Sequence, residues 1–421
     1  MRPSFMLLAG SLLDCISALP PARHKRNSSY VTLPFNTKRT ASLQERGSLR
    51  STSGFDSALQ RISVTSPYYI EVGIGTPPQT IDLVLDTGSS EIWAYSAQLS
   101  SSCSGCGSAY YDPSASHTAI ERDDLGILNI SYVSTSGVTG FYVSDTLETN
   151  GVSATNIVIG VATDFNSGDP RGGIMGIGLP QGEASILNSG IEYPGYIDQL
   201  KAEGLIGVRA YSIYLNAISA TSGLVIFGGY DKSKWVGGLV PFSLIEPAPD
   251  GYFHLDVAAP TLSLTLDGQT SEVPFSTVPY AVTLDTGTSI SLLPQTQIAA
   301  IAYALGATLF SGDDEETFYS LPCSLSSATG GLSFTFFGTS GPVTITVPYA
   351  ELVIDVSGFD LPAGQCLLGL SGFPDGAMDG AFLLGDTFLR SAYLIYNFDD
   401  MTVSLAQANW ESDCDDCIQP L

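Results

Sequence analysis

The strongest constraint on the fold is a short element that occurs once in each half of the chain. The sequence LVLDTGSS at residues 83–90 is matched by AVTLDTGTS at residues 281–289. A single Asp-Thr-Gly is consistent with an ordinary turn after a strand. Two copies, each after an apolar run and each followed by hydroxyl residues, indicate a duplicated structural unit.

A second element follows the first in the same order in both halves. The sequence IMGIG occupies residues 174–178, and FLLGD occupies residues 382–386. Each half therefore contains an apolar run, Asp-Thr-Gly, and then an apolar pair before glycine. This order predicts two homologous lobes, an N-terminal lobe at residues 66–241 and a C-terminal lobe at residues 242–408. A chain of 421 residues is also long for a single core.

The rest of the chain is typical of a mainly β protein. Short runs of β-branched and aromatic residues alternate with period two, as half-buried strands do. The 44 glycines and 24 prolines separate these runs into many turns. Helical periodicity is restricted to a few segments, chiefly residues 196–201 and 294–305. We therefore predict a mainly β protein.

The repeated Asp-Thr-Gly also predicts a chemistry. Each strand delivers an aspartate to its end, the glycine allows a tight turn, and the hydroxyls orient the carboxylate. Two such loops facing across a two-fold axis would bring Asp86 and Asp285 into contact. Carboxyls this close share one proton, and the pair can activate a water molecule. The residues expected to support the pair are Thr87, Gly88, Ser89, Thr286, Gly287 and Thr288.

Several stretches resemble the pepsin-like aspartic peptidase family, in its secreted, fungal form. They are YIEVGIGTPPQ at 69–79, DTGSSEIW at 86–93, VIFGG at 225–229 and FLLGDTFLR at 382–390, within a likeness that covers nearly all of 68–408. The resemblance implies a bilobal acid protease fold whose long cleft takes an extended peptide. It implies an aspartic endopeptidase that uses Asp86 and Asp285 and needs no metal or other cofactor.

Two other functions are compatible with paired acidic residues. A catalytically silent pepsin-like binding protein is the main alternative, and it is disfavoured because both Asp-Thr-Gly elements are intact. A glycosidase also uses paired acids, but it holds them further apart than carboxyls in direct contact.

The resemblance extends to two aromatic residues. Tyr132 matches the tyrosine of the flap that closes over substrate, and Trp93 matches the tryptophan that hydrogen-bonds and packs behind it. An ordinary strand aromatic and a plain core residue remain the alternatives for these two positions. The residues after Tyr132 depart from the family pattern, because VSTS occupies 133–136 where relatives have glycine or an acid and glycine.

The N-terminal segment indicates secretion as an inactive precursor. Residues 1–18 have a positive start, a short apolar stretch and small residues at the end, which is typical of a signal peptide. Residues 19–65 are basic and contain the dibasic pairs at 25–26 and 38–39, so we predict a propeptide that inhibits its own enzyme; a disordered tail with no inhibitory role is the alternative. The mature chain is expected to begin near residues 61–66. The predicted destination is extracellular, with a vacuole-like acidic compartment as the alternative.

The charge distribution supports this division. Nine of the 16 lysines and arginines lie in residues 1–65, against three acidic residues there. The remainder has seven basic and 39 acidic residues, a net charge of about −32. Such a surface repels nucleic acid and anionic membranes and fits work at low pH, where carboxylates are protonated. We expect a monomer that ends in an acidic tail at residues 409–421.

The cysteines predict disulfides rather than a metal site. Seven occur, and Cys15 leaves with the signal peptide. No histidine stands at zinc-ligand spacing from either Cys-x-x-Cys pair. By resemblance, Cys323 pairs with Cys366 in the second lobe and Cys103 with Cys106 in the first, whereas Cys414 and Cys417 have no family counterpart. Two triplets, at Asn27 and Asn129, are candidate N-glycosylation sites.

Overall fold

A computed structural model describes most of the chain after Gly54. The described residues are 55–61, 67–101, 109–132, 137–165, 172–245, 256–275, 281–312, 316–338, 340–356, 361–375, 381–412, 414 and 417–421. The predicted signal peptide, most of the predicted propeptide, Asn27, Cys103, Cys106 and the residues after Tyr132 at 133–136 lie outside these ranges.

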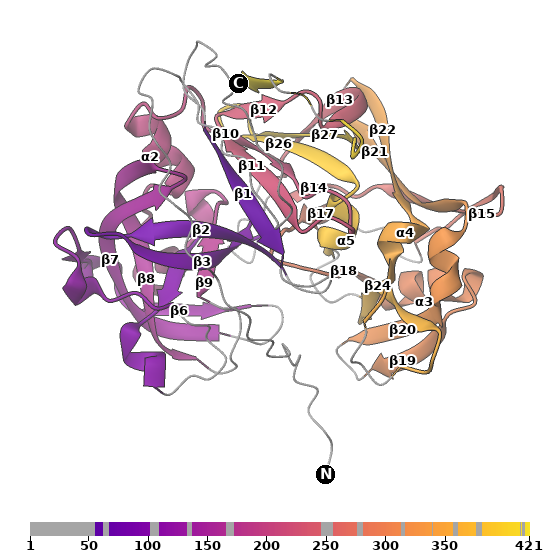
Figure 1. Cartoon of the computed structure of the whole chain (residues 1–421), viewed down its shortest axis with the longest axis horizontal. Coiled ribbons are helices and arrows are strands. Elements are labelled where there is room, and N and C mark those ends of the chain that lie inside the picture. The colour runs from indigo at the N-terminus through magenta and orange to yellow at the C-terminus, as the bar shows by residue number, and fades with distance from the viewer. Residues whose placement is uncertain are drawn as a thin grey trace, which may run out of the picture.

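The predicted fold class is confirmed: the protein is mainly β and has two sheet-rich lobes (Figure 1). A 14-stranded sheet forms the N-terminal lobe and continues into the centre of the molecule, in the order β13-β27-β26-β10-β11-β1-β2-β3-β9-β4-β8-β7-β5 with β6 beside β7. Its strands are β1 (Phe55–Arg61), β2 (Tyr68–Ile74), β3 (Gln79–Asp86), β4 (Ile92–Tyr95), β5 (Ile120–Glu121), β6 (Leu128–Ser131), β7 (Gly137–Thr149), β8 (Val152–Phe165), β9 (Gly173–Gly176), β10 (Ala210–Tyr214), β11 (Ser222–Phe227), β13 (Trp235–Ser243), β26 (Ala392–Asn397) and β27 (Thr402–Ala408).

The C-terminal lobe contains an eight-stranded and a four-stranded sheet. The larger sheet comprises β14 (Asp256–Ala258), β17 (Ala281–Leu284), β18 (Ser291–Pro294), β19 (Thr308–Gly312), β20 (Thr317–Pro322), β23 (Val353–Ile354), β24 (Gln365–Phe373) and β25 (Ala381–Leu384). The smaller comprises β15 (Thr261–Leu266), β16 (Gln269–Glu272), β21 (Gly330–Gly338) and β22 (Gly341–Pro348). The α-helices are short: α1 (Ala184–Ser189), α2 (Tyr196–Ala202), α3 (Gln295–Ala304), α4 (Tyr349–Leu352) and α5 (Asp386–Leu389). None of the described helices is long and apolar enough to cross a membrane.

Strand pairing explains why the two repeated elements occur in one order. In the first half, β3 runs parallel to β9, with Val84 opposite Ile174. In the second half, β17 runs parallel to β25, with Leu284 opposite Leu384. The strand that leads into each Asp-Thr-Gly is thus paired with the later apolar pair before glycine.

The two halves meet at the antiparallel pair β10 and β26 in the centre of the molecule (Figure 1). A single cluster of buried apolar residues passes from the first lobe through this pair into the second, and includes Leu83, Tyr211, Leu394 and Val282. Continuous burial of this kind holds the lobes together as one packed body.

Strand β1 lies within the segment that the sequence assigned to the end of the basic leader. It pairs with β11 on one side and with β2 on the other. Phe55 is 2% exposed, and its ring centroid lies 5.0 Å from that of Phe227. These seven residues are therefore an internal strand of the large sheet.

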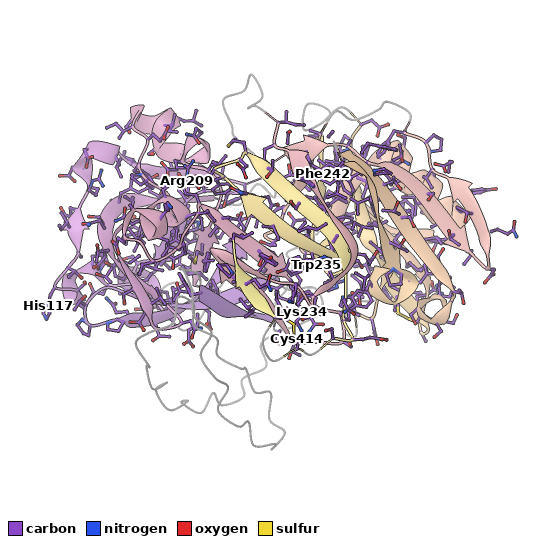
Figure 2. The ribbon with its side chains drawn as sticks, turned by 90° about the horizontal axis from the view of Figure 1, so that it is seen from above. His117, Arg209, Lys234, Trp235, Phe242 and Cys414 are labelled. Atoms are coloured by element: carbon purple, nitrogen blue, oxygen red, sulfur yellow. A yellow bond between two sulfur atoms is a disulfide. The ribbon has the colours of Figure 1, made fainter. Side chains whose placement is uncertain are left out.

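The acidic tail also packs against the body. Strand β28 (Ile418–Pro420) pairs with β12 (Gly229–Asp231) to form a separate two-stranded sheet. A disulfide joins Cys414 to Cys417. The Lys234 ammonium donates to the carbonyl of Ser412 at 2.8 Å, and Figure 2 shows Lys234, Trp235 and Cys414 close to the middle of the molecule. The tail thereby covers part of the central sheet.

Replacing Phe55 by alanine tests whether β1 belongs to the folded body. Deleting a buried phenylalanine ring leaves a cavity, so we expect the free energy of unfolding to fall by about 3 kcal/mol or more. Ile120→Ala is the control, because that side chain is 60% exposed. Thermal unfolding of the purified chain measures both. Equal shifts in Tm for the two variants would contradict the assignment of β1.

Candidate active site

Asp86 and Asp285 come together at the interface of the two lobes. Asp86 ends β3, Asp285 follows β17, and the two side chains are 5% and 8% exposed. A Cβ added at Gly88 would lie 2.6 Å from the carboxyl carbon of Asp285, and one added at Gly287 would lie 2.7 Å from Oδ1 of Asp86. Only glycine fits at either position, because each loop lies against the other loop's carboxylate.

Each carboxylate is held in the same way by its own loop. The N–H of Gly88 donates to Oδ1 of Asp86 at 2.8 Å, and the Ser89 hydroxyl donates to Oδ2. For Asp285, the equivalent donors are Gly287 N–H at 2.8 Å and Thr288 Oγ1 at 2.5 Å. The predicted support residues therefore donate to both oxygens of each carboxylate. These hydrogen bonds fix the orientation of each carboxylate relative to its own loop.

Two threonines exchange hydrogen bonds across the lobes. The N–H of Thr87 donates to Oγ1 of Thr286 at 3.1 Å, and the N–H of Thr286 donates to Oγ1 of Thr87 at the same distance. The two hydroxyls then donate at 2.7 Å to the carbonyls of Leu284 and Leu85, which precede the aspartates. Because every partner belongs to the opposite loop, neither loop can shift without breaking a buried hydrogen bond.

Burial and proximity together favour a bound proton on the pair. The pKa of Asp86 is raised well above its usual range, first by burial and then by the charge of Asp285. The hydrogen bonds from Ser89 and Gly88 oppose this shift but do not cancel it. Two carboxyls in contact that cannot both ionise act as one acid and one base.

The indole N–H of Trp93 donates to the hydroxyl of Tyr132 at 2.7 Å. Trp93 is fully buried, with its ring edge-on to that of Tyr95 at a centroid distance of 5.1 Å. Tyr132 directly follows β6 and belongs to the same apolar cluster. The structure thus joins the two aromatic residues that the sequence singled out.

The structure also describes the second-lobe cysteines and one of the glycosylation triplets. A disulfide joins Cys323 to Cys366, which lies in β24 beside β20. Asn129 is exposed on β6. His117 lies at the outer edge of the N-terminal lobe (Figure 2). Within the described ranges, no group of three or more His, Cys, Asp or Glu side chains converges as a metal site would.

Two buried glutamates beside the site were missed by the sequence reasoning. Glu91, five residues after Asp86, accepts a hydrogen bond from the N–H of Ala184, and burial raises its pKa to about 7. Glu183 accepts from the N–H of Tyr193 at 3.1 Å, and burial raises its pKa to about 10. In the sequence, Glu91 lies between Ser90 and the apolar pair Ile-Trp. An acidic residue next to apolar residues is the sequence feature that could have indicated its burial.

These shifts predict a loss of stability toward neutral pH. An acid whose pKa is raised by folding stabilises the native state while it is protonated, and this contribution is lost as pH rises through the folded pKa. For Glu91 the window runs from about pH 4.5 to about 7 and amounts to about 3 kcal/mol at its upper end. For Glu183 it extends to about pH 10.

We therefore expect Glu91→Gln to reduce the fall in Tm between pH 4.5 and pH 7. Glutamine keeps the acceptor for the Ala184 N–H but cannot ionise. Glu121→Gln, an exposed acid of the same lobe, is the control and should retain the wild-type fall. The account of Glu91 fails if its variant loses Tm with pH as steeply as the control does.

Comparisons with known proteins agree with this geometry. Residues 67–408 match the family model described as eukaryotic aspartyl protease. The chain is 33% identical over 413 residues to the acid protease of Saccharomycopsis fibuligera, covering 95% of this chain and 98% of that protein. It is 32% identical over 427 residues to candidapepsin-1 of Candida albicans, covering 98% and 97%.

A further relative is the protein named probable aspartic-type endopeptidase OPSB of Arthroderma benhamiae, 34% identical over 359 residues, or 82% of this chain and 69% of that one. The crystal structure of aspartic proteinase from Irpex lacteus has the same fold, with a TM-score of 0.66 over 86% of this chain and 99% of that one at 20% identity. The chain belongs to the eukaryotic aspartyl protease family and is a hydrolase of the aspartic type.

Proposed function

We propose that the protein hydrolyses peptide bonds with a water molecule held between Asp86 and Asp285. The observation that supports this most strongly is the exchange of hydrogen bonds between Thr87 and Thr286, which brings the two carboxyls into contact. Both Asp-Thr-Gly loops are complete and hold their carboxylates, which disfavours the alternative of a silent binding protein.

The chemistry requires a single proton on the pair. The ionised carboxyl takes a proton from the water molecule while the water oxygen attacks the peptide carbonyl carbon. The protonated carboxyl donates its proton to the carbonyl oxygen. The tetrahedral diol then collapses: a proton passes to the nitrogen, the C–N bond breaks, and one carboxyl keeps the remaining proton. The raised pKa of Asp86, due to burial and the charge of Asp285, supports a monoanionic pair at acidic pH.

The substrate we propose is an extended peptide lying between the lobes. Tyr132 accepts a hydrogen bond from the buried Trp93, and its pKa is raised first by burial and then by the charge of Asp86, so its hydroxyl lies within electrostatic range of the pair. An aromatic side chain held in this way limits the positions that a peptide backbone can take beside Asp86 and Asp285. Peptides of protein substrates, and the protein's own basic leader, are the partners that fit an acidic body.

We further propose secretion of an inactive precursor, with residues 1–18 as signal peptide and a basic leader that inhibits the acidic body until carboxylates protonate. The sequence pattern predicts a mature start near residues 61–66. The pairing of β1 with β11 and β2 favours a start before Phe55, because removing this strand would expose an internal part of the sheet. Carbohydrate at the exposed Asn129 is compatible with this route.

Acid-induced processing of the purified precursor tests the proposed function, with wild type beside Asp285→Asn. At about pH 3–5 we expect the wild type to shorten its leader and digest an unfolded protein, and the variant to do neither. Gel electrophoresis and N-terminal sequencing follow both events. If the two are equally inert, the binding-protein alternative replaces the proposal. If they are equally active, the assignment of the dyad is wrong.

Glycine-to-alanine substitution tests whether contact between the loops is required. A Cβ at Gly88 would collide with the Asp285 carboxyl, so Gly88→Ala should reduce kcat/KM at least about 100-fold by displacing the pair. Gly238→Ala is the matched control, because no heavy atom lies within 4 Å of its added Cβ. Comparable activity in the two variants would refute a dyad in contact.

A further inference from the structure

The two Asp-Thr-Gly loops differ in the hydrogen bonds that the carbonyl before each aspartate accepts. The carbonyl of Leu284, which precedes Asp285, accepts the Thr87 hydroxyl at 2.7 Å and also the Tyr396 hydroxyl at 3.0 Å. The equivalent carbonyl of Leu85 accepts the Thr286 hydroxyl at 2.7 Å. Among the described residues, no tyrosine hydroxyl donates to it. The Asp285 loop therefore has one more buried donor than the Asp86 loop.

The extra donor is one member of a tyrosine pair at the centre of the molecule. Tyr211 on β10 and Tyr396 on β26 stand directly opposite each other where the two halves meet. Both are fully buried, and their ring centroids are 5.0 Å apart with an interplanar angle of 31°. The Tyr211 hydroxyl has no hydrogen-bond partner in the described part of the chain. Of these two opposed tyrosines, Tyr396 therefore donates a hydrogen bond to the Asp285 loop, and Tyr211 does not.

We propose that Tyr396 is a positioning residue for Asp285, and that its hydroxyl fixes the Leu284–Asp285 peptide. The proposal rests on the proposed function of the dyad. In this proposal, Tyr396 influences the reaction through the Leu284 carbonyl, to which its hydroxyl donates, and not by contact with substrate.

The packing of Tyr396 makes its hydroxyl a well-defined anchor. Its ring lies against that of Tyr211, which in turn meets the ring of Phe398 edge-on at 5.7 Å. A phenol held this way has little rotamer freedom, so its O–H fixes the position of the carbonyl it bonds. The Asp285 N–H on the other side of the same peptide donates to the Leu384 carbonyl at 3.0 Å. The peptide before the catalytic residue is thus held at both of its polar atoms.

A change in this peptide alters the spacing of the two carboxyls. Their coupling depends steeply on distance in a buried site. If the Asp285 loop is less well fixed, the carboxyls separate on average and the pair binds its shared proton less tightly. The pH at which the pair loses that proton then falls, and fewer molecules hold the geometry needed for attack on the peptide carbonyl.

The test compares Tyr396→Phe with Tyr211→Phe, using activated enzyme and a peptide substrate. Both variants remove one buried hydroxyl from the same ring pair, but only the first loses a hydrogen bond to a catalytic loop. For Tyr396→Phe we expect kcat to fall about tenfold with KM within about twofold, and the alkaline limb of the kcat profile to move to lower pH. For Tyr211→Phe we expect wild-type kcat and an unshifted limb.

Thermal unfolding and Asp285→Asn complete the design. If Tyr396→Phe lowers Tm but leaves kcat and the alkaline limb at wild-type values, the role is structural and the proposal is wrong. Equal loss of kcat in both tyrosine variants would overturn it too, because the missing hydrogen bond would not then be the cause. If Asp285→Asn retains activity, the proposed function fails instead, independently of the tyrosines.

Discussion

The hydrogen bonds exchanged between Thr87 and Thr286 are the constraint on which the rest of the structure depends. They join loops that are far apart in the chain, and each uses a backbone N–H that would otherwise be buried without a partner. Because both hydroxyls also donate to carbonyls of the opposite half, the two Asp-Thr-Gly loops form one unit. The two carboxyls are in contact because these hydrogen bonds join the loops, and neither lobe alone would bring them together.

The surrounding sheets keep these loops in place. Parallel pairing of β3 with β9 and of β17 with β25 holds each strand that delivers an aspartate. Strands β10 and β26 pair where the two halves meet, and β1 continues the same sheet beside β11. In the second lobe a buried ion pair adds rigidity: Nε of Arg390 donates to Glu351 at 2.6 Å and neither side chain is more than 3% exposed. Removing either partner would leave an uncompensated buried charge.

The sequence was sufficient for features that repeat locally. The paired Asp-Thr-Gly elements, their apolar strands and the alternating pattern predict two homologous β-rich lobes and the residues that hold each carboxylate. Features that depend on distant contacts were out of reach. The basic composition of the leader concealed that β1 lies in the sheet, and nothing near Tyr396 indicates a bond to Leu284. The burial of Glu91 and Glu183 depends on α1 packing beside the Asp86 loop, which periodicity does not reveal.

The central claim is that Asp86 and Asp285 share a single proton across the lobe interface. Neutron diffraction from deuterated crystals of the activated enzyme, grown at acidic pH, locates that proton directly. The account predicts one deuteron between the facing carboxyl oxygens, while Gly88 and Ser89 still donate to the Asp86 carboxyl and Gly287 and Thr288 to the Asp285 carboxyl. Two fully ionised carboxylates, or two carboxyls each protonated toward separate partners, would contradict it.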